Sequence, residues 1–214
     1  MLELAAIVAG YLLGSIPAPY WITRLRKGID IRTVGVRNMG CANVLREVGI
    51  WEGVLAAIID IGKGAAAVWV AQLMGVAEYW AWGAGFAAIV GHSFPVFLGF
   101  RGGRGAAAFI GVMLVISPLS TLIALVAIGI LWLIIRHMFT TLAVTAPVLL
   151  VATWLIEQSP VLLAYIAITV LFIVLRARYR LGELKIVLGR LFGGGKPAGE
   201  GNTGSYPPQK NIEG

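Results

Sequence analysis

A glycine-rich segment with two arginines leads directly into an apolar stretch. Residues 99–105 read GFRGGRG, and a helix is expected to begin near Ala106. Glycines leave backbone N–H groups accessible, and a helix N-terminus adds partial positive charge to that of two guanidinium groups. This composition suits an anion such as phosphate. The alternative is a tight basic turn between two helices. The segment matches neither the P-loop nor the dinucleotide-binding fingerprint.

Two charged residues lie within an apolar stretch. Asp60 and Lys63 are three residues apart, so they share one helix face and can pair. Charges inside a membrane are costly and usually face the interior of a helix bundle. The pair is either a structural ion pair or part of a substrate site near the cytoplasmic surface. Gly62 and Gly64 flank Lys63 and would allow another backbone to approach closely, which favours a site.

The most polar part of the apolar region is the loop 30–49. It reads DIRTVGVRNMGCANVLREVG, and its amide and guanidinium groups are donors suited to an oxyanion. The alternative is a connector whose arginines only set membrane topology. These donors are Arg37, Asn38, Asn43 and Arg46.

Histidine and cysteine point to no further chemistry. Neither His92 nor His137 has an aspartate five residues on, so the His-x4-Asp acyltransferase motif is absent. A lone histidine such as His92, followed by the helix-disrupting Pro95, is more often hydrogen-bonded structure than a catalyst. No cluster of metal ligands occurs, and we expect neither metal nor cofactor. The single cysteine, Cys41, is expected to stay reduced in a cytoplasmic loop.

The overall composition predicts a membrane protein. Of 214 residues, 59% are hydrophobic and only 13% are charged, and the mean hydropathy is +0.88. A soluble fold of this size cannot bury so much apolar surface. The net charge of +7 is assigned to membrane topology and to attraction of anionic lipid or substrate, not to nucleic acid.

Seven apolar stretches are expected to form an all-α, polytopic domain. Two of them meet at Ser117-Pro118, which is either a kink in one helix or a turn between two. The expected stretches are 2–22, 53–74, 80–98, 106–116, 119–135, 141–156 and 160–175.

The positions of Lys and Arg decide between the kink and the turn. With a turn there are seven spans, and every basic loop then falls on one side of the membrane. The positive-inside rule makes that side cytoplasmic, with the N-terminus outside and the C-terminus inside. Residues 1–192 are therefore expected to be one transmembrane domain. The Gly- and Pro-rich segment 193–214 is expected to be a disordered cytoplasmic tail.

Several motifs resemble a known family in matching order from about residue 10 to residue 180. The most specific is GHSFPVFLGFRGGRGAA at 91–107. The others are GSIPAPYWI at 14–22, GIDIR at 28–32, GVRNMGCANVLREVG at 35–49 and DIGKG at 60–64. The sequence is similar to the acyl-phosphate-dependent glycerol-3-phosphate acyltransferases, the PlsY family.

The resemblance implies a seven-helix protein of the bacterial inner membrane. Its members transfer an acyl group from acyl phosphate to sn-glycerol 3-phosphate in phospholipid biosynthesis, so both substrates and membrane lipid are the expected partners. No obligate protein partner is evident. The implied phosphate-binding residues are Arg101, Gly102, Gly103, Arg104 and Lys63. The implied catalytic residues are Arg46, Asn38 and Asn43, with Asp60 and His92 in support.

The sequence departs from the family pattern in the glycine-rich motif, where the family's lysines are arginines, which keeps the charge but not the shape, and at three further places. The family's Gly-Ser-Gly-Asn is here Gly35-Val36-Arg37-Asn38. Its Arg-His-Arg-x-Asn-Ile aligns with RARYRL at 176–181, so the expected His and Asn are Ala177 and Arg180. A serine pair in the loop between the fifth and sixth helices aligns with Thr141 and Leu142.

These departures leave two alternatives beside the acyltransferase. One is a divergent paralogue that uses another anionic acceptor. The other is a catalytically inactive lipid-binding or anion-binding membrane protein, including a transporter, although no internal repeat is found.

Overall fold

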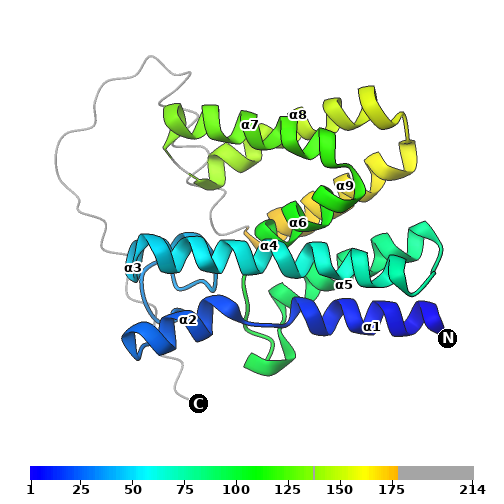
Figure 1. Cartoon of the computed structure of the whole chain (residues 1–214). Coiled ribbons are helices and arrows are strands. Elements are labelled where there is room, and N and C mark those ends of the chain that lie inside the picture. Colours follow the sequence, from blue (N-terminus) through cyan, green and yellow to red (C-terminus); the bar gives the residue numbers. More distant parts are fainter. Residues whose placement is uncertain (137, 178–214) are drawn as a thin grey trace.

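The computed structural model describes residues 1–136 and 138–177, without the side chains of residues 138 and 139. Within these ranges the chain is helical and contains no strand, as the sequence predicts (Figure 1). The longer helices are α1 (Leu2–Gly14), α2 (Ala18–Lys27), α4 (Ile50–Leu73), α5 (Glu78–Ser93), α6 (Ala106–Ile116), α7 (Pro118–Ile135), α8 (Met138–Glu157) and α9 (Pro160–Arg176). The short helix α3 (Cys41–Glu47) lies in the first loop, residues 28–49, which connects α2 to α4. A 3-10 turn, η1 (Val96–Leu98), follows α5.

The first expected stretch, 2–22, lies within one candidate membrane span, Leu2–Lys27, but it is not one continuous helix. Helix α1 ends at Gly14 and α2 begins at Ala18. Pro17 has no N–H to donate and disfavours helical geometry in the residue before it, so the helix breaks there. Helix α2 then runs to Lys27 and is capped by Gly28 in the left-handed conformation, at φ 69°.

Glycines bring the helices α1, α4, α5 and α6 into close contact. A Cβ at Gly14 would overlap the carbonyl oxygen of Ala88, so α1 packs directly on the backbone of α5. A Cβ at Gly64 of α4 would overlap the carbonyl of Ala108 in α6, and one at Gly111 would overlap that of Ile61. Small residues at membrane-helix interfaces permit this close backbone packing. The site is therefore built on a rigid four-helix body.

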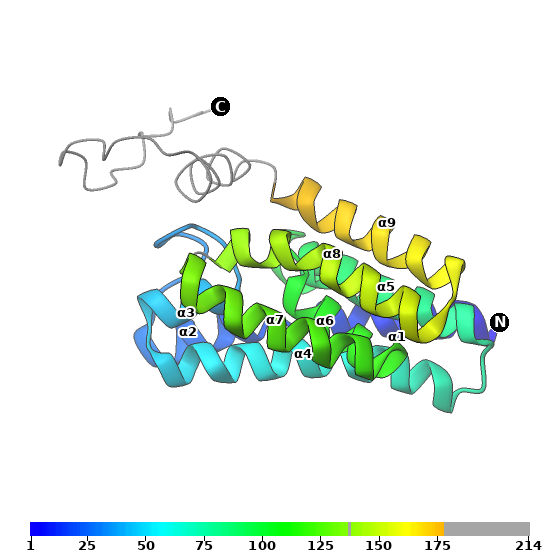
Figure 2. The same cartoon turned by 90° about the horizontal axis from the view of Figure 1, so that it is seen from above.

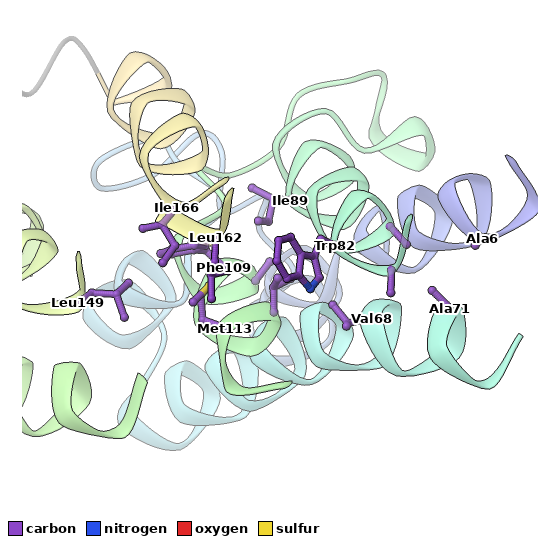
Figure 3. Packing of buried hydrophobic residues seen from close by; sticks show 14 of the residues in the cluster. Ala6, Val68, Ala71, Trp82, Ile89, Phe109, Met113, Leu149, Leu162 and Ile166 are labelled. Carbon is purple, nitrogen blue, oxygen red and sulfur yellow. The ribbon is translucent and has the colours of Figure 1, made fainter. Parts of the chain in front are cut away.

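A cluster of buried apolar side chains joins this body to the last helices (Figure 3). Val68, Trp82 and Met113 come from α4, α5 and α6, and Leu162 and Ile166 from α9. Of these, Val68, Met113 and Ile166 are fully buried. This packing fixes α9 against the body and so places Arg176 at its end.

Helices α6 and α7 are separate and meet at Ser117. The turn, and not the kink, is therefore present. Helices α7 and α8 pack against each other as a hairpin beside α6 (Figure 1), and α9 runs along one side of the molecule (Figure 2). Thr141 and Leu142, expected in a loop, lie within α8, because this helix already begins at Met138.

Apolar side chains cover the outer surfaces of the helices. Val126, Ile130 and Leu133 of α7 are each more than half exposed. Five helices, counting α1 and α2 together, are long and apolar enough to cross a membrane, and α6 and α9 are shorter apolar helices. Among the described residues this is the surface of an integral membrane protein with lipid as the solvent.

Candidate active site

A cavity of about 370 Å³ lies between the four-helix body and the last three helices. Its polar end is lined by side chains from the first loop with α3, from α4, from the end of α5 and from the segment that precedes α6. These are Asn38, Asn43, Arg46, Asp60, His92 and Arg104. Its other end is lined by apolar side chains of α6, α7, α8 and α9, among them Met113, Ala124, Leu149 and Val170. The cavity thus joins a cationic entrance to an apolar groove.

The polar end of the cavity reaches into the length of α4, away from the end of this helix that follows the first loop. Asp60 is ten residues inside α4, which begins at Ile50. At 1.5 Å per residue this places Asp60 about 15 Å along the helix. Helix α5 ends beside it at Ser93, so the irregular segment 94–105 starts at this depth. Irregular backbone at membrane depth is tolerated where it is buried in protein or lines a cavity.

Asp60, Lys63 and His92 form a buried cluster at the cavity wall. Lys63 Nζ lies 2.8 Å from Asp60 Oδ1, and His92 Nδ1 lies 3.4 Å from the same oxygen. Lys63 also donates a 2.8 Å hydrogen bond to the carbonyl of Ile16, between α1 and α2. The expected pairing of Asp60 with Lys63 is therefore present. Lys63 uses its ammonium group within the protein, while Asp60 and His92 belong to the cavity lining.

Asn43 organises the first loop. Its amide nitrogen lies 3.1 Å from each of three carbonyl oxygens, those of Ile31, Val34 and Asn38. Its side-chain oxygen accepts a 3.1 Å hydrogen bond from the N–H of Val36. With 1% exposure, this amide fixes the loop that presents the neighbouring donors to the cavity.

On the side of the first loop, the cavity wall also includes Asn38, Cys41 and Arg46. Arg46 is exposed and follows Asn43 by three residues in α3, so the two face the same side of the helix. Burial, followed by the negative charge of Asp60, raises the pKa of the Cys41 thiol to about 11. Cys41 is therefore a protonated wall residue and not an activated nucleophile.

The glycine-rich segment 99–105 is bound tightly to the end of α5. The N–H of Gly102 donates to the carbonyl of Ser93 at 3.3 Å, and that of Gly103 donates to the carbonyl of His92 at 3.0 Å. These two N–H groups therefore serve the fold. Gly105, at φ 92°, turns the chain into α6, and Gly105, Ala106 and Ala107 line the cavity beside Arg104. The donors that this region offers an anion are the Arg104 guanidinium and the α6 N-terminus.

Asp30 and Arg32 hold the first loop against η1, which directly precedes the glycine-rich segment. Arg32 pairs with Asp30 at 2.7 Å and donates a 3.2 Å hydrogen bond to the carbonyl of Leu98. The hydrogen bond from Arg32 lowers the pKa of Asp30 below its usual value. Both side chains keep substantial exposure, so the pair contributes little net stability.

Arg176 supports the glycine-rich segment from α9, a role that the sequence patterns did not assign to it. It donates hydrogen bonds to the carbonyls of Ser93 at 3.2 Å and Gly103 at 3.4 Å. Its guanidinium carbon lies 4.3 Å from the centre of the Phe94 ring. Two signals were available: Arg176 aligns with the first Arg of the family motif Arg-His-Arg-x-Asn-Ile, and it is the first basic residue after the last apolar stretch, a place that membrane topology alone explains.

The cavity brings together six of the residues expected from the sequence: Asn38, Asn43, Arg46, Asp60, His92 and Arg104. Lys63 stands behind Asp60. Arg101 is exposed, while Gly102 and Gly103 support the segment through their backbone. Arg180 and the expected tail 193–214 lie outside the described residues.

This is an integral membrane fold whose cationic cavity continues into an apolar groove. Such a cavity suits a ligand that is anionic at one end and apolar at the other. Over residues 4–185 the chain matches the family described as glycerol-3-phosphate acyltransferase. The chain belongs to this family, which confirms the resemblance noted in its motifs.

Curated relatives share most of this length. Glycerol-3-phosphate acyltransferase 2 of Dehalococcoides mccartyi (strain 195) is 33% identical over 213 residues, covering 100% of this chain and 97% of the relative. Glycerol-3-phosphate acyltransferase of Geotalea daltonii is 37% identical over 186 residues, covering 86% of this chain and 94% of the relative.

Two crystal structures share the fold. PlsY (YgiH), an integral membrane glycerol 3-phosphate acyltransferase, superimposes in its glycerol 3-phosphate form with a TM-score of 0.79 and 29% identity, covering 89% of this chain and 98% of PlsY. Its lysophosphatidic acid form gives a TM-score of 0.78 and 28% identity, covering 86% and 92%.

Proposed function

We propose that this chain transfers an acyl group from acyl phosphate to sn-glycerol 3-phosphate, giving lysophosphatidic acid and inorganic phosphate. Family membership supports the acyltransferase activity and the acceptor. The observation that carries the proposal is the cavity itself, in which Arg46, Asn38 and Arg104 meet an apolar groove. Both substrates are phosphates and one carries a hydrocarbon tail, so a single cavity with these two ends fits both.

The acyl tail occupies the groove, and the two phosphates lie at the polar end. The lining of α6 runs from Ala106 to Met113 and that of α7 from Ile128 to Thr121, so each spans about 10 Å at 1.5 Å per residue. Arg46 and Arg104 enter the polar end from opposite elements, the first loop and the α6 N-terminus. Placed so, they bind the two phosphates and bring the reacting groups together.

The reaction forms one C–O bond and breaks another. The acceptor hydroxyl oxygen attacks the acyl carbonyl carbon, and the bond from that carbon to the phosphate oxygen breaks with its electron pair on the phosphate. A phosphate oxygen of a substrate accepts the hydroxyl proton. Because acyl phosphate is already activated, positioning and stabilisation of the developing negative charge carry the catalysis. Arg46, Arg104 and the Asn38 amide supply this charge stabilisation, and Asn43 positions the loop.

The altered motifs favour a test of a second acceptor. Arg37 is exposed and adopts φ 49°, in a position where the family usually has glycine. Ala177, at the family's histidine position, is buried. A divergent paralogue would use the extra charge of Arg37 for a more anionic acceptor. A catalytically inactive, lipid-binding protein is the third candidate.

An acceptor panel separates the three candidates. Purified protein would receive one acyl phosphate with glycerol 3-phosphate, other polyol phosphates or no acceptor, and the acylated products would be identified by mass spectrometry. Preference for glycerol 3-phosphate is the expected result. Preference for another polyol phosphate would support the paralogue, and no product beside an active relative would support the inactive binding protein.

The transmembrane arrangement that we propose has seven crossings of the bacterial inner membrane, with the N-terminus outside. The separation of α6 from α7 at Ser117 supports this count, because it keeps Arg136 on the same side as the other basic loops. Helix α1 and helix α2 together form the first crossing. Residues 1–192 form the transmembrane domain, and 193–214 form a cytoplasmic tail.

A further inference from the structure

The cluster of Asp60, Lys63 and His92 has no direct part in the transfer described above. Each side chain is at most 5% exposed, and burying charged groups is costly even when they are paired. We infer that this cluster sets the position of Arg104 in the cavity, and that His92 is the positioning residue that contacts the glycine-rich segment.

The cluster is anchored at the break between α1 and α2. The N–H of Tyr20 donates to the carbonyl of Pro17, so it does not reach the carbonyl of Ile16 as it would in a continuous helix. Lys63 takes that carbonyl instead, at 2.8 Å. The same ammonium group holds Asp60 at 2.8 Å. The cluster is therefore held by α4, which carries Asp60 and Lys63, and by the break between α1 and α2.

Asp60 in turn orients His92. His92 Nδ1 lies 3.4 Å from Asp60 Oδ1. The opposite edge of the imidazole, with Nε2, points toward Gly103 of the glycine-rich segment. A carboxylate that contacts one ring nitrogen commonly fixes the orientation of the ring. His92 is only 3% exposed, so the ring has little room to turn.

His92 contacts the segment in two ways. Its carbonyl accepts the hydrogen bond from Gly103 at 3.0 Å. Its ring lies so close to Gly103 that a Cβ there would overlap Nε2. Gly103 directly precedes Arg104, so a shift of the ring moves the backbone from which Arg104 extends.

Arg176 closes the arrangement from α9. Its hydrogen bonds to the carbonyls of Ser93 and Gly103 tie the same segment to the last helix. The segment is thus held between the end of α5 and the end of α9, and on the α5 side the carbonyls of His92 and Ser93 and the His92 ring contact it. Removal of the imidazole leaves both carbonyls in place, but it should loosen Gly103 and Arg104 without removing the guanidinium itself.

The kinetic test compares His92→Ala, His92→Gln and Asp60→Asn with Gly62→Ala. Gly62 lies on α4 between Asp60 and Lys63, and a Cβ there would meet nothing within 4 Å, so Gly62→Ala is the matched control. This arm rests on the proposed function. The His92 and Asp60 variants should raise KM for glycerol 3-phosphate by about tenfold, and His92→Ala should add little to Arg104→Ala in the double variant. An unchanged KM, or fully multiplicative effects, would overturn the inference.

A second arm needs no activity. The sequence has a single cysteine, so Cys41→Ala with Arg104→Cys carries one thiol, at position 104. Its labelling rate by a water-soluble thiol reagent should change by about fivefold or more on adding His92→Gln, and not on adding Gly62→Ala. Equal labelling rates in all three proteins would overturn the positioning role. If the unaltered protein fails to acylate glycerol 3-phosphate, the proposed function falls, while the labelling arm still decides this inference.

Discussion

At the scale of single residues, the two arginines of the glycine-rich segment have different surroundings. Arg104 lines the cavity, whereas Arg101 is exposed. We expect Arg104→Ala to lower kcat/KM for glycerol 3-phosphate by about a hundredfold, since it removes a charge-assisted contact to phosphate. Arg104→Lys should recover part of the loss, because lysine keeps the charge but not the planar fork. Steady-state kinetics of the purified protein checks this.

Arg26→Ala is the matched control for Arg104→Ala. Arg26 forms an exposed ion pair with Glu52 at 2.9 Å, and such pairs contribute little. Its kinetics should stay close to those of the unaltered protein. A larger loss from Arg101→Ala than from Arg104→Ala would contradict the assignment of Arg104 as the main phosphate ligand of the segment.

Asn43 allows a test with an isosteric change. In Asn43→Asp the side chain keeps its size but can no longer donate to the carbonyls of Ile31, Val34 and Asn38. A buried carboxylate beside three carbonyl oxygens should lower the free energy of unfolding by about 2–4 kcal/mol. The thermal unfolding midpoint in detergent should fall at least as far for Asn43→Asp as for Asn43→Ala. A midpoint for Asn43→Asp close to the unaltered value would show that the loop does not depend on this amide.

The Cys41 thiol makes a prediction about pH. Its pKa is raised to about 11, so the thiolate that reacts with alkylating agents is scarce at neutral pH. In the folded protein the alkylation rate should keep rising with pH toward about 11. In the unfolded protein the rate should level off above the pKa of a free thiol, about 8.5. Alkylation by iodoacetamide, followed by mass spectrometry, measures both rates. A folded-state rate that levels off near pH 8 would contradict the burial of the thiol.

The sequence predicted which residues lie at the site better than it predicted which groups those residues contact. It identified Asn43, but not that the amide is consumed by three carbonyls of its own loop. It predicted accessible N–H groups at Gly102 and Gly103, yet these bond to the end of α5. Such partners depend on how α5 and the segment pack, which one sequence without its fold does not specify.

At the scale of elements, the depth of the groove should set the preferred acyl chain. Met113 of α6 and Leu149 of α8 lie at the far end of their cavity-lining stretches, and Ala124 of α7 lies nearby. Met113→Ala should shift preference toward longer chains and Ala124→Leu toward shorter ones, because they lengthen and fill the groove. Initial rates with a series of acyl phosphates measure the shift.

Val126→Leu serves as the control for the groove variants. Val126 is on α7 and is 64% exposed, on the surface that faces lipid. This change should leave the chain-length profile unaltered. An unaltered profile for Ala124→Leu as well would mean that the acyl tail does not lie along α7.

Runs of apolar residues predicted most of the helices. Ser117-Pro118 left a kink or a turn open, and the positions of Lys and Arg favoured the turn that the structure has, with Pro118 in the first turn of α7. The break at Pro17 was missed, because the stretch 2–22 is almost uniformly apolar and hydropathy does not register a break. Helix α8 begins before the expected stretch 141–156, and the polar residue Thr140, which precedes that stretch, is buried in the helix.

At the scale of the whole molecule, the basic residues predict its orientation. In a Cys41→Ala background, Glu78→Cys places a single exposed thiol between the second and third crossings, and Arg26→Cys places one at the end of α2, where the first loop begins. A membrane-impermeant thiol reagent should label the first in intact spheroplasts and the second only after the membrane is broken. The reverse pattern would contradict an outside N-terminus.

In the proposed reaction the cavity holds acyl phosphate and glycerol 3-phosphate together, and the acyl group passes from the first to the second. The most direct measurement incubates purified protein with palmitoyl phosphate and labelled glycerol 3-phosphate, and quantifies lysophosphatidic acid and inorganic phosphate together. Both products should form in equal amounts, only when both substrates are present, and Arg104→Ala should strongly reduce them. Release of phosphate without lysophosphatidic acid, or no turnover beside an active relative, would contradict the proposed reaction.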